Sequence, residues 1–377
     1  MGLRRLLSGL LVLGMFLPSV GVLGDNKKRL EVSGRVLVDA DAYESFWSKE
    51  DDDTTTNLEL RNARLQFEYD FPKGWEGKLQ LDVEADSDDA NLDYGSVYVR
   101  YKKWKPADIT LGRLKESQGM ELNTGASSLL TIERSMMTNA FTAGKSWGIH
   151  LFDANKKRRW ALAAVIEDDQ NNRYDEDEPF ALVGRYTRSP INTDEQTLQL
   201  GVSASLRDWR DNTFRIGNRA EVGSADRMVR SAEFVADQQA VLGLEGVFRH
   251  RQWQVQGEYM ATRVEEKDGP DWDYSGYYLT GSYLFGGAQR RFGKGEFKRL
   301  KPAFRVGFWE LVARYSYLDV RQRGLGSTAS ITTLGANYYV SEHLRLMLAW
   351  LHPDISGSVR HENPDGDALS ARVQINF

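Results

Sequence analysis

Residues 368–377 read Ala-Leu-Ser-Ala-Arg-Val-Gln-Ile-Asn-Phe, and apolar and polar side chains alternate along them. Leu369 and Val373 fall on one face of this segment, whereas Arg372 and Gln374 fall on the other. A period of two residues is that of a β-strand with one apolar face. The C-terminal segment is therefore predicted to be a strand whose two faces meet different surroundings.

The same alternation recurs along the chain, for example at 79–85, 198–206, 309–317 and 344–350. No segment of helical length shows a convincing apolar period of 3.6 residues. We expect sixteen strands, at residues 30–43, 57–71, 75–86, 93–104, 108–114, 145–153, 158–167, 179–188, 196–206, 240–249, 252–263, 274–285, 307–319, 330–340, 343–352 and 367–377.

An even number of strands of about ten residues, joined alternately by short turns and longer polar loops, is typical of barrels in the bacterial outer membrane. The longer loops are expected at 44–56, 167–178 and 353–366. The predicted fold class is therefore all-β, a transmembrane antiparallel β-barrel with inward-folded long loops. A barrel of this size is wide enough to hold water, so a pore is expected.

Composition narrows the alternatives. The 377 residues include no cysteine, 41% are hydrophobic and 27% are charged, which argues against a disordered chain, a disulfide-rich small protein and a helical membrane bundle. A soluble β-sandwich or propeller would show the same alternation. Aromatic residues near predicted strand ends, such as Tyr69, Trp75, Trp253 and Trp350, favour a barrel in lipid.

The N-terminal segment has the layout of a secretory signal. Arg4 and Arg5 precede a short apolar run, interrupted by Pro18, and small residues follow it. We expect residues 1–24 to be a signal peptide that is removed, and 25–377 to form the barrel domain. Without these two arginines the 49 basic residues become 47, and the formal net charge changes from −5 to −7. A general nucleic-acid-binding function is not expected for an acidic chain.

The sequence contains no catalytic motif in the structural context that its chemistry requires. Residues 144–148, Gly-Lys-Ser-Trp-Gly, fit a nucleophile pattern but open a predicted barrel strand, and 139–146 resemble a phosphate loop that lacks its first glycine and its helix. The five histidines show no metal-ligand spacing. We therefore expect no enzyme activity, no metal and no cofactor.

Charge is segregated along the chain. The predicted long loops are acidic, whereas segment 287–305 holds seven basic residues and one acidic residue on the short-turn side. This segment is either a basic inner vestibule that concentrates anions or an ordinary solvated run of charge.

Two other long segments are candidates for the lumen. Segment 207–239 contains Arg215 and Arg219, which share a face, but its six arginines are matched by six acids. It could line a pore with guanidinium groups or form a salt-bridged loop. Segment 115–143 would narrow the lumen if it folded inward, with Lys115 among its charged members.

The chain resembles the phosphate-selective porin O and P family, whose members are 16-stranded outer-membrane channels that assemble as homotrimers. The resemblance spans nearly the whole of 25–377. It rests on Ser33-Gly-Arg-Val-Leu-Val-Asp39, Arg61-Asn-Ala-Arg-Leu65, Leu111-Gly-Arg-Leu-Lys-Glu116, Thr131-Ile-Glu-Arg134, Leu242-Gly-Leu-Glu245, Trp309-Glu-Leu-Val-Ala-Arg-Tyr-Ser-Tyr-Leu-Asp319, Leu344-Arg-Leu-Met-Leu348 and Gln374-Ile-Asn-Phe377.

The resemblance implies an arginine ladder that leads through a constriction to a lysine-rich inner vestibule. By matching position, Arg134 corresponds to the constriction arginine. The other implied members are wall residues Arg35, Arg61 and Arg64, ladder residues Arg215 and Arg219, and inner lysines Lys294, Lys298 and Lys301. Ser117 and Gln118 stand where the family commonly has Pro-Phe, so the shape of the third loop is expected to differ.

The predicted function is passive diffusion of small solutes through an outer-membrane porin that prefers anions such as phosphate or polyphosphate. Expected partners are these anions, outer-membrane lipid and lipopolysaccharide, and two further copies in a homotrimer, without nucleic acid. The alternatives are a general or cation-preferring porin, a plugged structural or adhesive barrel, and a barrel enzyme such as a lipase. The acidic outer loops weaken the case for phosphate, although exposed charges are screened beyond about 8 Å at physiological salt.

Overall fold

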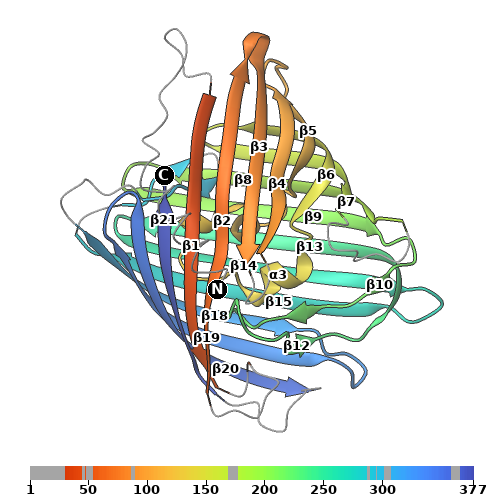
Figure 1. The fold of residues 1–377 in the computed structure, drawn as a ribbon. Helices are drawn as coiled ribbons and strands as arrows, with labels where there is room; N and C mark the ends of the chain where they lie inside the picture. The colour runs from red at the N-terminus through yellow and green to blue at the C-terminus, as the bar shows by residue number, and fades with distance from the viewer. Residues whose placement is uncertain are drawn as a thin grey trace.

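The computed structural model describes residues 30–44, 47, 54–85, 90–168, 177–286, 289–293, 295–300, 307–357 and 366–377. Within these ranges the chain forms a closed antiparallel barrel of sixteen long strands, in which the last strand pairs with the first. The predicted signal peptide at 1–24 lies outside the described residues. Figure 1 shows the curved wall, with helix α3 (Met136–Phe141) enclosed by it.

The wall consists of β1 (Leu30–Tyr43), β2 (Thr55–Phe71), β3 (Trp75–Ala85), β4 (Ala90–Tyr101), β5 (Asp108–Lys115), β6 (Lys145–Ala154), β7 (Arg158–Glu167), β8 (Phe180–Asn192), β9 (Gln196–Asp208), β13 (Phe234–His250), β14 (Trp253–Glu266), β15 (Trp272–Leu284), β18 (Phe308–Asp319), β19 (Ser327–Tyr339), β20 (Leu344–Gly357) and β21 (Ala368–Asn376). Every predicted strand is confirmed. The bounds differ most at the start of β13 and at the end of β20.

Strand β20 continues five residues beyond its predicted end at 352, into the segment expected to be a loop. Pro353 and Asp354 are of residue types that are common in loops. In the structure, however, Pro353 pairs with Ile331 of β19. Proline is tolerated in a strand where its nitrogen faces no partner. The pairing of β20 with β21 ends at Leu351 and Ala368, so Pro353 lies on a one-sided edge.

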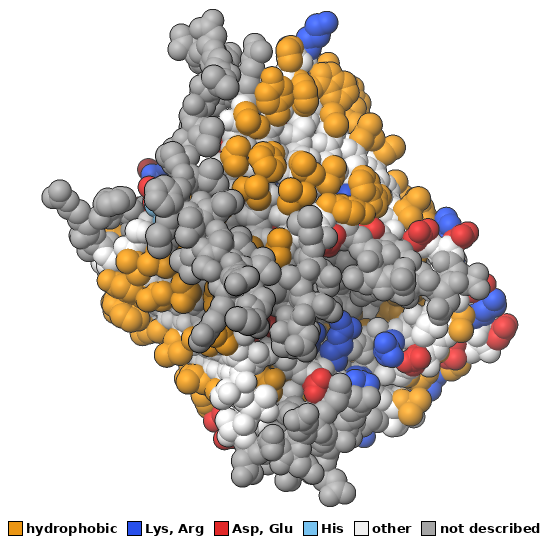
Figure 2. Space-filling model, in the orientation of Figure 1, with side chains coloured by type: hydrophobic (Ala, Val, Ile, Leu, Met, Phe, Trp, Pro, Cys, Tyr) orange, Lys and Arg blue, Asp and Glu red, His pale blue; other side chains and the backbone are white. Residues whose placement is uncertain are grey.

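The two faces of each strand meet different surroundings, as the alternation predicted. On β18, the side chain of Trp309 is 52% exposed on the outside, whereas that of Arg314 is 3% exposed on the inside. Outward apolar side chains suit contact with lipid, and inward polar ones suit a lumen. Figure 2 shows the hydrophobic side chains gathered over the outer face of β2 to β5, with charged ones toward the right edge of the view.

Aromatic side chains ring the short-turn end of the barrel. The pairs Trp75–Tyr101, Trp253–Tyr283 and Trp309–Tyr338 have ring centroids 4.9, 4.6 and 4.7 Å apart. Each pair joins neighbouring strands at the end of the barrel where the short connections lie, and Tyr283 and Trp309 also flank the longer connection 285–307. In outer-membrane barrels, a girdle of this kind lies at the membrane–water interface, because amphipathic aromatic rings are stable at the level of the lipid head groups.

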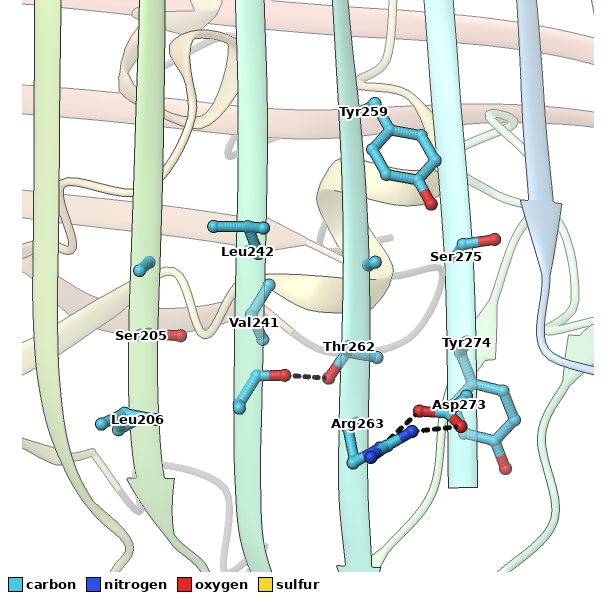
Figure 3. Close-up of a pocket in the computed structure, with 13 residues that line it drawn as sticks. Ser205, Leu206, Val241, Leu242, Tyr259, Thr262, Arg263, Asp273, Tyr274 and Ser275 are labelled. Carbon is cyan, nitrogen blue, oxygen red and sulfur yellow. Dashed lines mark hydrogen bonds and ion pairs between the residues drawn. The ribbon is translucent and has the colours of Figure 1, made fainter. Parts of the chain in front are cut away.

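The apolar outer band ends near the long loops on β14 and β15. There the guanidinium of Arg263 donates to both carboxylate oxygens of Asp273, at 2.8 and 3.0 Å (Figure 3). Both side chains are more than half exposed. On the side of the pair away from the long loops, Leu242 and Tyr259, with Leu206 beside them, project from the outer face around a shallow hollow of about 590 Å³. An exposed ion pair belongs in water or among lipid head groups, so it marks the edge of the apolar band.

The connections carry the remaining short elements. None of the described helices is long and apolar enough to cross a membrane. The short elements are η2 (Pro72–Gly74), α2 (Met120–Asn123), η3 (Ala126–Ser128), α3, β10 (Thr213–Phe214), β11 (Gly217–Asn218), β12 (Val229–Arg230), β16 (Phe292–Gly293) and β17 (Glu296–Phe297).

Helix α3 packs against the inner face of β14, β15 and β18. Ser135 caps its N-terminus, because its hydroxyl accepts from the backbone N–H of Thr138. A Cβ atom at Gly276 of β15 would lie 3.0 Å from the Cβ atom of Met137 and 2.8 Å from the carbonyl oxygen of Tyr317. Because Gly276 has no side chain, α3 can pack closely against β15.

We predict that Gly276→Val lowers the stability of the folded barrel by about 1–3 kcal/mol, the usual cost of overpacking a filled interior. The measurement is the temperature at which the detergent-solubilised protein loses its folded mobility on a gel. Gly281→Val is the matched control on the same strand, since a Cβ atom there meets nothing within 4 Å. Equal transition temperatures for the two variants would contradict the assigned role of Gly276.

Candidate functional site

The segment between β5 and β6 folds into the barrel. It turns inward at Gly119, whose φ is +72°. A Cβ atom at Gly119 would lie 2.5 Å from the carboxylate of Glu258 on β14. This carboxylate accepts the backbone N–H groups of Met120 and Glu121, each at 2.6 Å. Glycine is required here because both the backbone conformation and the close approach exclude a side chain.

Further along, side chains of the wall donate to the backbone carbonyls of this inward segment. Backbone groups without secondary structure need other partners when they are buried. The strands supply most of them: Gln374 to Ser127, Arg345 to Leu129 and Leu130, Asn337 to Leu130, Arg372 to Ile132 and Arg314 to Glu133. Arg290, from the connection between β15 and β18, donates to Ser128. The path of an irregular segment is therefore fixed by the wall.

Ion pairs add to this attachment. Arg314 of β18 pairs with Glu121 and with Glu221, which belongs to the segment between β9 and β13. Arg372 of β21 pairs with Glu133 at 2.8 Å, and also with Asp39 of β1 at 2.6 Å. Buried charges of this kind are tolerated only when they are paired and hydrogen-bonded.

Glu133 lies on the inward segment, outside the spanning strands, and Arg61 also holds its carboxylate at 3.0 Å. Burial alone would raise the pKa of this carboxyl. The attraction of Arg61 and Arg372 outweighs burial, and the pKa is about 2 instead of its ordinary 4.5. Glu133 is therefore ionised at every physiological pH.

The segment between β9 and β13 fills the same side of the lumen. Its residues Phe214, Ile216 and Val222 form one buried apolar cluster with Met136 of α3 and Trp272 of β15. Apolar side chains are thus packed inside the barrel near the long loops. This half of the lumen is a protein core and not a water-filled path.

The opposite side of the lumen is open and basic. A cavity of about 700 Å³ lies between β1 to β7 and the inward segment. Each of these strands contributes one basic residue to its lining: Arg35, Arg64, Lys78, Arg100, Lys115, Lys145 and Arg159. Glu31 and Glu296 are the carboxylates among the described residues that line it.

Ion pairs with carboxylates do not neutralise all of the basic side chains that line the cavity. Arg64 pairs with Asp82 at 2.5 Å, and Lys145 approaches the same carboxylate at 3.5 Å. Within the described part of the chain, Arg35 donates to the side-chain amide oxygen of Asn62, at 3.0 Å, and Lys115 donates to backbone carbonyls. Neither Arg35 nor Lys115 forms an ion pair with any carboxylate in the described ranges. A cavity with this charge excess attracts anions.

The structure brings some of the residues predicted from sequence together in this cavity. Arg35, Arg64 and Lys115 line it. Arg134 lies beside it and donates to the carbonyls of Glu121 and Thr124, at 3.1 and 2.9 Å. Arg134 thus shapes the inward segment, and its role at a constriction stays a prediction.

Other predicted residues lie apart from the cavity lining. Arg61 binds Glu133, Arg215 forms an exposed pair with Glu233 at 3.0 Å, and Arg219 donates to the carbonyl of Gly223 within its own turn. The arginine-rich segment 207–239 is therefore partly a salt-bridged loop, which is one of the two alternatives that the sequence allowed. The ladder role of Arg215 and Arg219 stays a prediction.

The basic segment between β15 and β18 folds over the short-turn mouth of the cavity. Phe297 packs against Met120 of α2 and Val247 of β13, and Arg299 lines the cavity. Lys298 is exposed and pairs with Glu296. Lys294 and Lys301 lie outside the described residues.

Several cavity residues were not singled out from the sequence. They are Lys78, Arg100, Lys145, His150, Arg159 and Arg299. The sequence did contain evidence for these residues, because they occupy inward positions of predicted strands or belong to the basic segment 287–305. What the sequence did not reveal is which side of the barrel the inward segments would leave open. Among the described residues, no group of acids and histidines could hold a metal ion.

The chain was compared with known proteins. A family model described as phosphate-selective porin O and P matches residues 30–377. A comparison with curated protein sequences gives no match.

Solved structures share the fold at low identity. An anion-selective porin from Comamonas acidovorans has a TM-score of 0.60 and 13% identity, over 92% of this chain and 99% of that one. The trimer form of OmpT, an outer membrane protein of Vibrio cholerae, has a TM-score of 0.57 and 9% identity, over 92% and 99%. The outer membrane channel DcaP of Acinetobacter baumannii has a TM-score of 0.57 and 10% identity, over 94% and 100%.

We predict that the attachment of the inward segment weakens in acid through Glu133. A carboxyl with a lowered folded pKa adds stability above its unfolded value of 4.5, and this stability is lost as the pH falls toward 2. The measurement is the free energy of unfolding in lipid or detergent between pH 5 and pH 2. We expect Glu133→Gln to be less stable than the parent at pH 5, on the order of 1–3 kcal/mol, with a smaller further loss at pH 2.

The exposed Glu195, which pairs only at 3.5 Å with Arg251, provides the control variant Glu195→Gln. If Glu133→Gln and the parent lost stability equally between pH 5 and pH 2, the assignment to Glu133 would be wrong.

Proposed function

The chain belongs to the phosphate-selective porin O and P family, and we propose that its basic cavity is the path by which small anions, phosphate above all, cross the outer membrane. The protein is a porin of the bacterial outer membrane. Its role is that of a channel, without catalysis. The observation that carries the proposal is one basic side chain from each of strands β1 to β7 on one side of the lumen.

Electrostatics favours anions in such a cavity. Low-dielectric walls focus the field of the basic groups, which raises the local concentration of anions. The two lining carboxylates, Glu31 and Glu296, are outnumbered. Lys298 also partly neutralises Glu296.

Passage requires that binding be weak enough for release. Guanidinium and ammonium groups replace part of the hydration shell of an anion and exchange it between neighbours. Arg64 and Lys145 share one carboxylate, so an anion competes with Asp82 for each of them. Arg35 holds no carboxylate of the described chain and presents its guanidinium fork, which matches the oxygens of phosphate. A row of partly satisfied donors suits conduction better than one fully free binding site.

The inward segment provides the constriction in this proposal. Arg134 holds the carbonyls of Glu121 and Thr124, and Lys115 holds those of Leu122 and Thr124. In this proposal, Arg134 and Lys115 are the two cations of the constriction. Arg61, Arg215 and Arg219 would guide anions from the long-loop side, and Lys294, Lys298 and Lys301 would receive them at the inner mouth.

Export and assembly complete the proposal. Residues 1–24 would direct export and be removed, leaving 25–377 as the barrel domain. The chain would assemble as a homotrimer, in line with the trimer form of the V. cholerae protein of similar fold. Lipid and lipopolysaccharide would surround the outer face, and phosphate is the preferred small partner.

A plugged barrel is the second candidate, because buried ion pairs and apolar packing close one half of the lumen. The basic cavity opposes it. A purified protein that gives no single-channel current in a planar bilayer would favour the plugged barrel. Release of fatty acids from phospholipid would instead favour an enzyme.

We predict anion selectivity, measured as the reversal potential of the reconstituted channel in a potassium chloride gradient. Arg35→Gln should lower the anion-to-cation permeability ratio by about twofold, because it removes one cation that no described carboxylate neutralises. Phosphate should reduce the chloride current of the parent.

Arg251→Gln is the matched control, since Arg251 is exposed, pairs with Glu195 and does not line the cavity. A cation-selective parent would remove the proposal. An equal effect of the two substitutions would move the selective region away from β1.

A further inference from the structure

The inner faces of β4, β5 and β6 align three polar side chains in one row near the short-turn mouth of the cavity. Arg100 lies opposite Thr110, and Thr110 lies opposite His150. Directly opposed side chains have Cβ atoms about 5 Å apart. All three residues line the cavity.

His150 is buried and its ring nitrogen is unsatisfied. Its side chain is only 5% exposed, and Nε2 has no hydrogen-bond partner among the described groups. Leaving a buried polar atom without a partner costs about 1–3 kcal/mol. An atom of this kind that borders a cavity is suited to a ligand that enters the cavity.

Two arginines of the cavity lining stack on aromatic rings. The guanidinium carbon of Arg100 lies 4.7 Å from the ring centroid of Tyr98, and that of Arg159 lies 4.8 Å from the ring centroid of Phe152. Arg100 also donates to the hydroxyl of Thr110 at 3.0 Å. Guanidinium groups fixed in this way lose little entropy when they bind an anion.

The basic segment covers this region from the short-turn end. A Cβ atom at Gly295 would lie 2.9 Å from the side chain of Arg159, so the backbone passes directly over it. Arg299 adds a further cation to the lining. The carboxylates near these arginines are Glu76, 3.4 Å from Arg100, Glu296 on the covering segment, and Glu245, which pairs with Arg185 at 2.6 Å. Basic groups therefore remain in excess.

We propose that Arg100, His150 and Arg159 form a second anion subsite that binds tetrahedral oxyanions of the phosphate class, nearer the short-turn mouth than Arg35, Arg64 and Lys115. The subsite rests on the proposed function and deepens it. In the tautomer with hydrogen on Nε2, His150 donates to an oxyanion oxygen, and the arginines supply the charge. A directional N–H donor distinguishes a phosphate oxygen from chloride, which has no preferred direction.

Block of the chloride current by inorganic phosphate tests the subsite in planar bilayers. His150→Leu should raise the half-blocking phosphate concentration about tenfold, the loss expected for one hydrogen bond to a charged ligand, and should change chloride conductance by less than about twofold. His150→Gln keeps a donor and should stay within about threefold of the parent.

Two further variants complete the design. Arg100→Met should also weaken the block, and its effect should not add to that of His150→Leu, because both groups contact the same ion. His250→Leu is the control, since His250 bonds to Gln196 and does not line the cavity. Retained folded mobility on a gel shows that each variant is a barrel.

The outcomes separate the two proposals. If the parent is anion-selective and blocked by phosphate but His150→Leu is blocked equally, the subsite is overturned and the channel proposal stands. If the parent shows neither anion preference nor phosphate block, the proposed function fails and the subsite with it. Equal weakening of the chloride current and the phosphate block in His150→Leu would also overturn the subsite, because a general change in the pore would explain it.

Discussion

The structure depends on how the wall satisfies a buried, irregular segment of backbone. Residues between β5 and β6 enter the lumen with little regular structure, so their peptide groups need partners outside their own chain segment. Five side chains of β18 to β21, together with Arg290 from the connection between β15 and β18, donate to the carbonyls of residues 127–133. Glu258 accepts the N–H groups at its start. The wall thus fixes the position of the segment, and the position of the segment defines the free lumen.

This attachment divides the barrel into two unlike halves. Arginines on β18 and β21 are used as structural partners, because each forms buried ion pairs with the inward segments. Arginines and lysines on β1 to β7 face the cavity and are only partly satisfied. A buried arginine with two carboxylates is held too firmly to exchange a passing ion, since breaking such a pair leaves charges unpaired. The same residue type therefore has different roles on different strands of the wall.

Apolar packing also distinguishes the two halves of the barrel. Helix α3 and the segment between β9 and β13 form a core inside the barrel, where a porin would otherwise contain water. A third segment, between β15 and β18, closes over the inner mouth and brings Phe297 onto α2. The remaining cavity is lined mainly by strands near the N-terminus. Selectivity then follows from which side of the lumen stays open.

The sequence by itself determined the wall. Alternation of apolar and polar residues is a local property, because successive side chains of a strand point to opposite faces, and it was sufficient to locate all sixteen strands. The family resemblance, and not the alternation, pointed to Arg35 and Arg64, and the long charged segment 115–143 pointed to Lys115. Only the tertiary structure decided which basic groups stay available, because their partners come from distant parts of the chain. Arg61 meets Glu133 across 72 residues, and Arg314 meets Glu121 across 193. No local pattern encodes such pairings, since they arise only when the closed barrel brings its far wall to the inward segments.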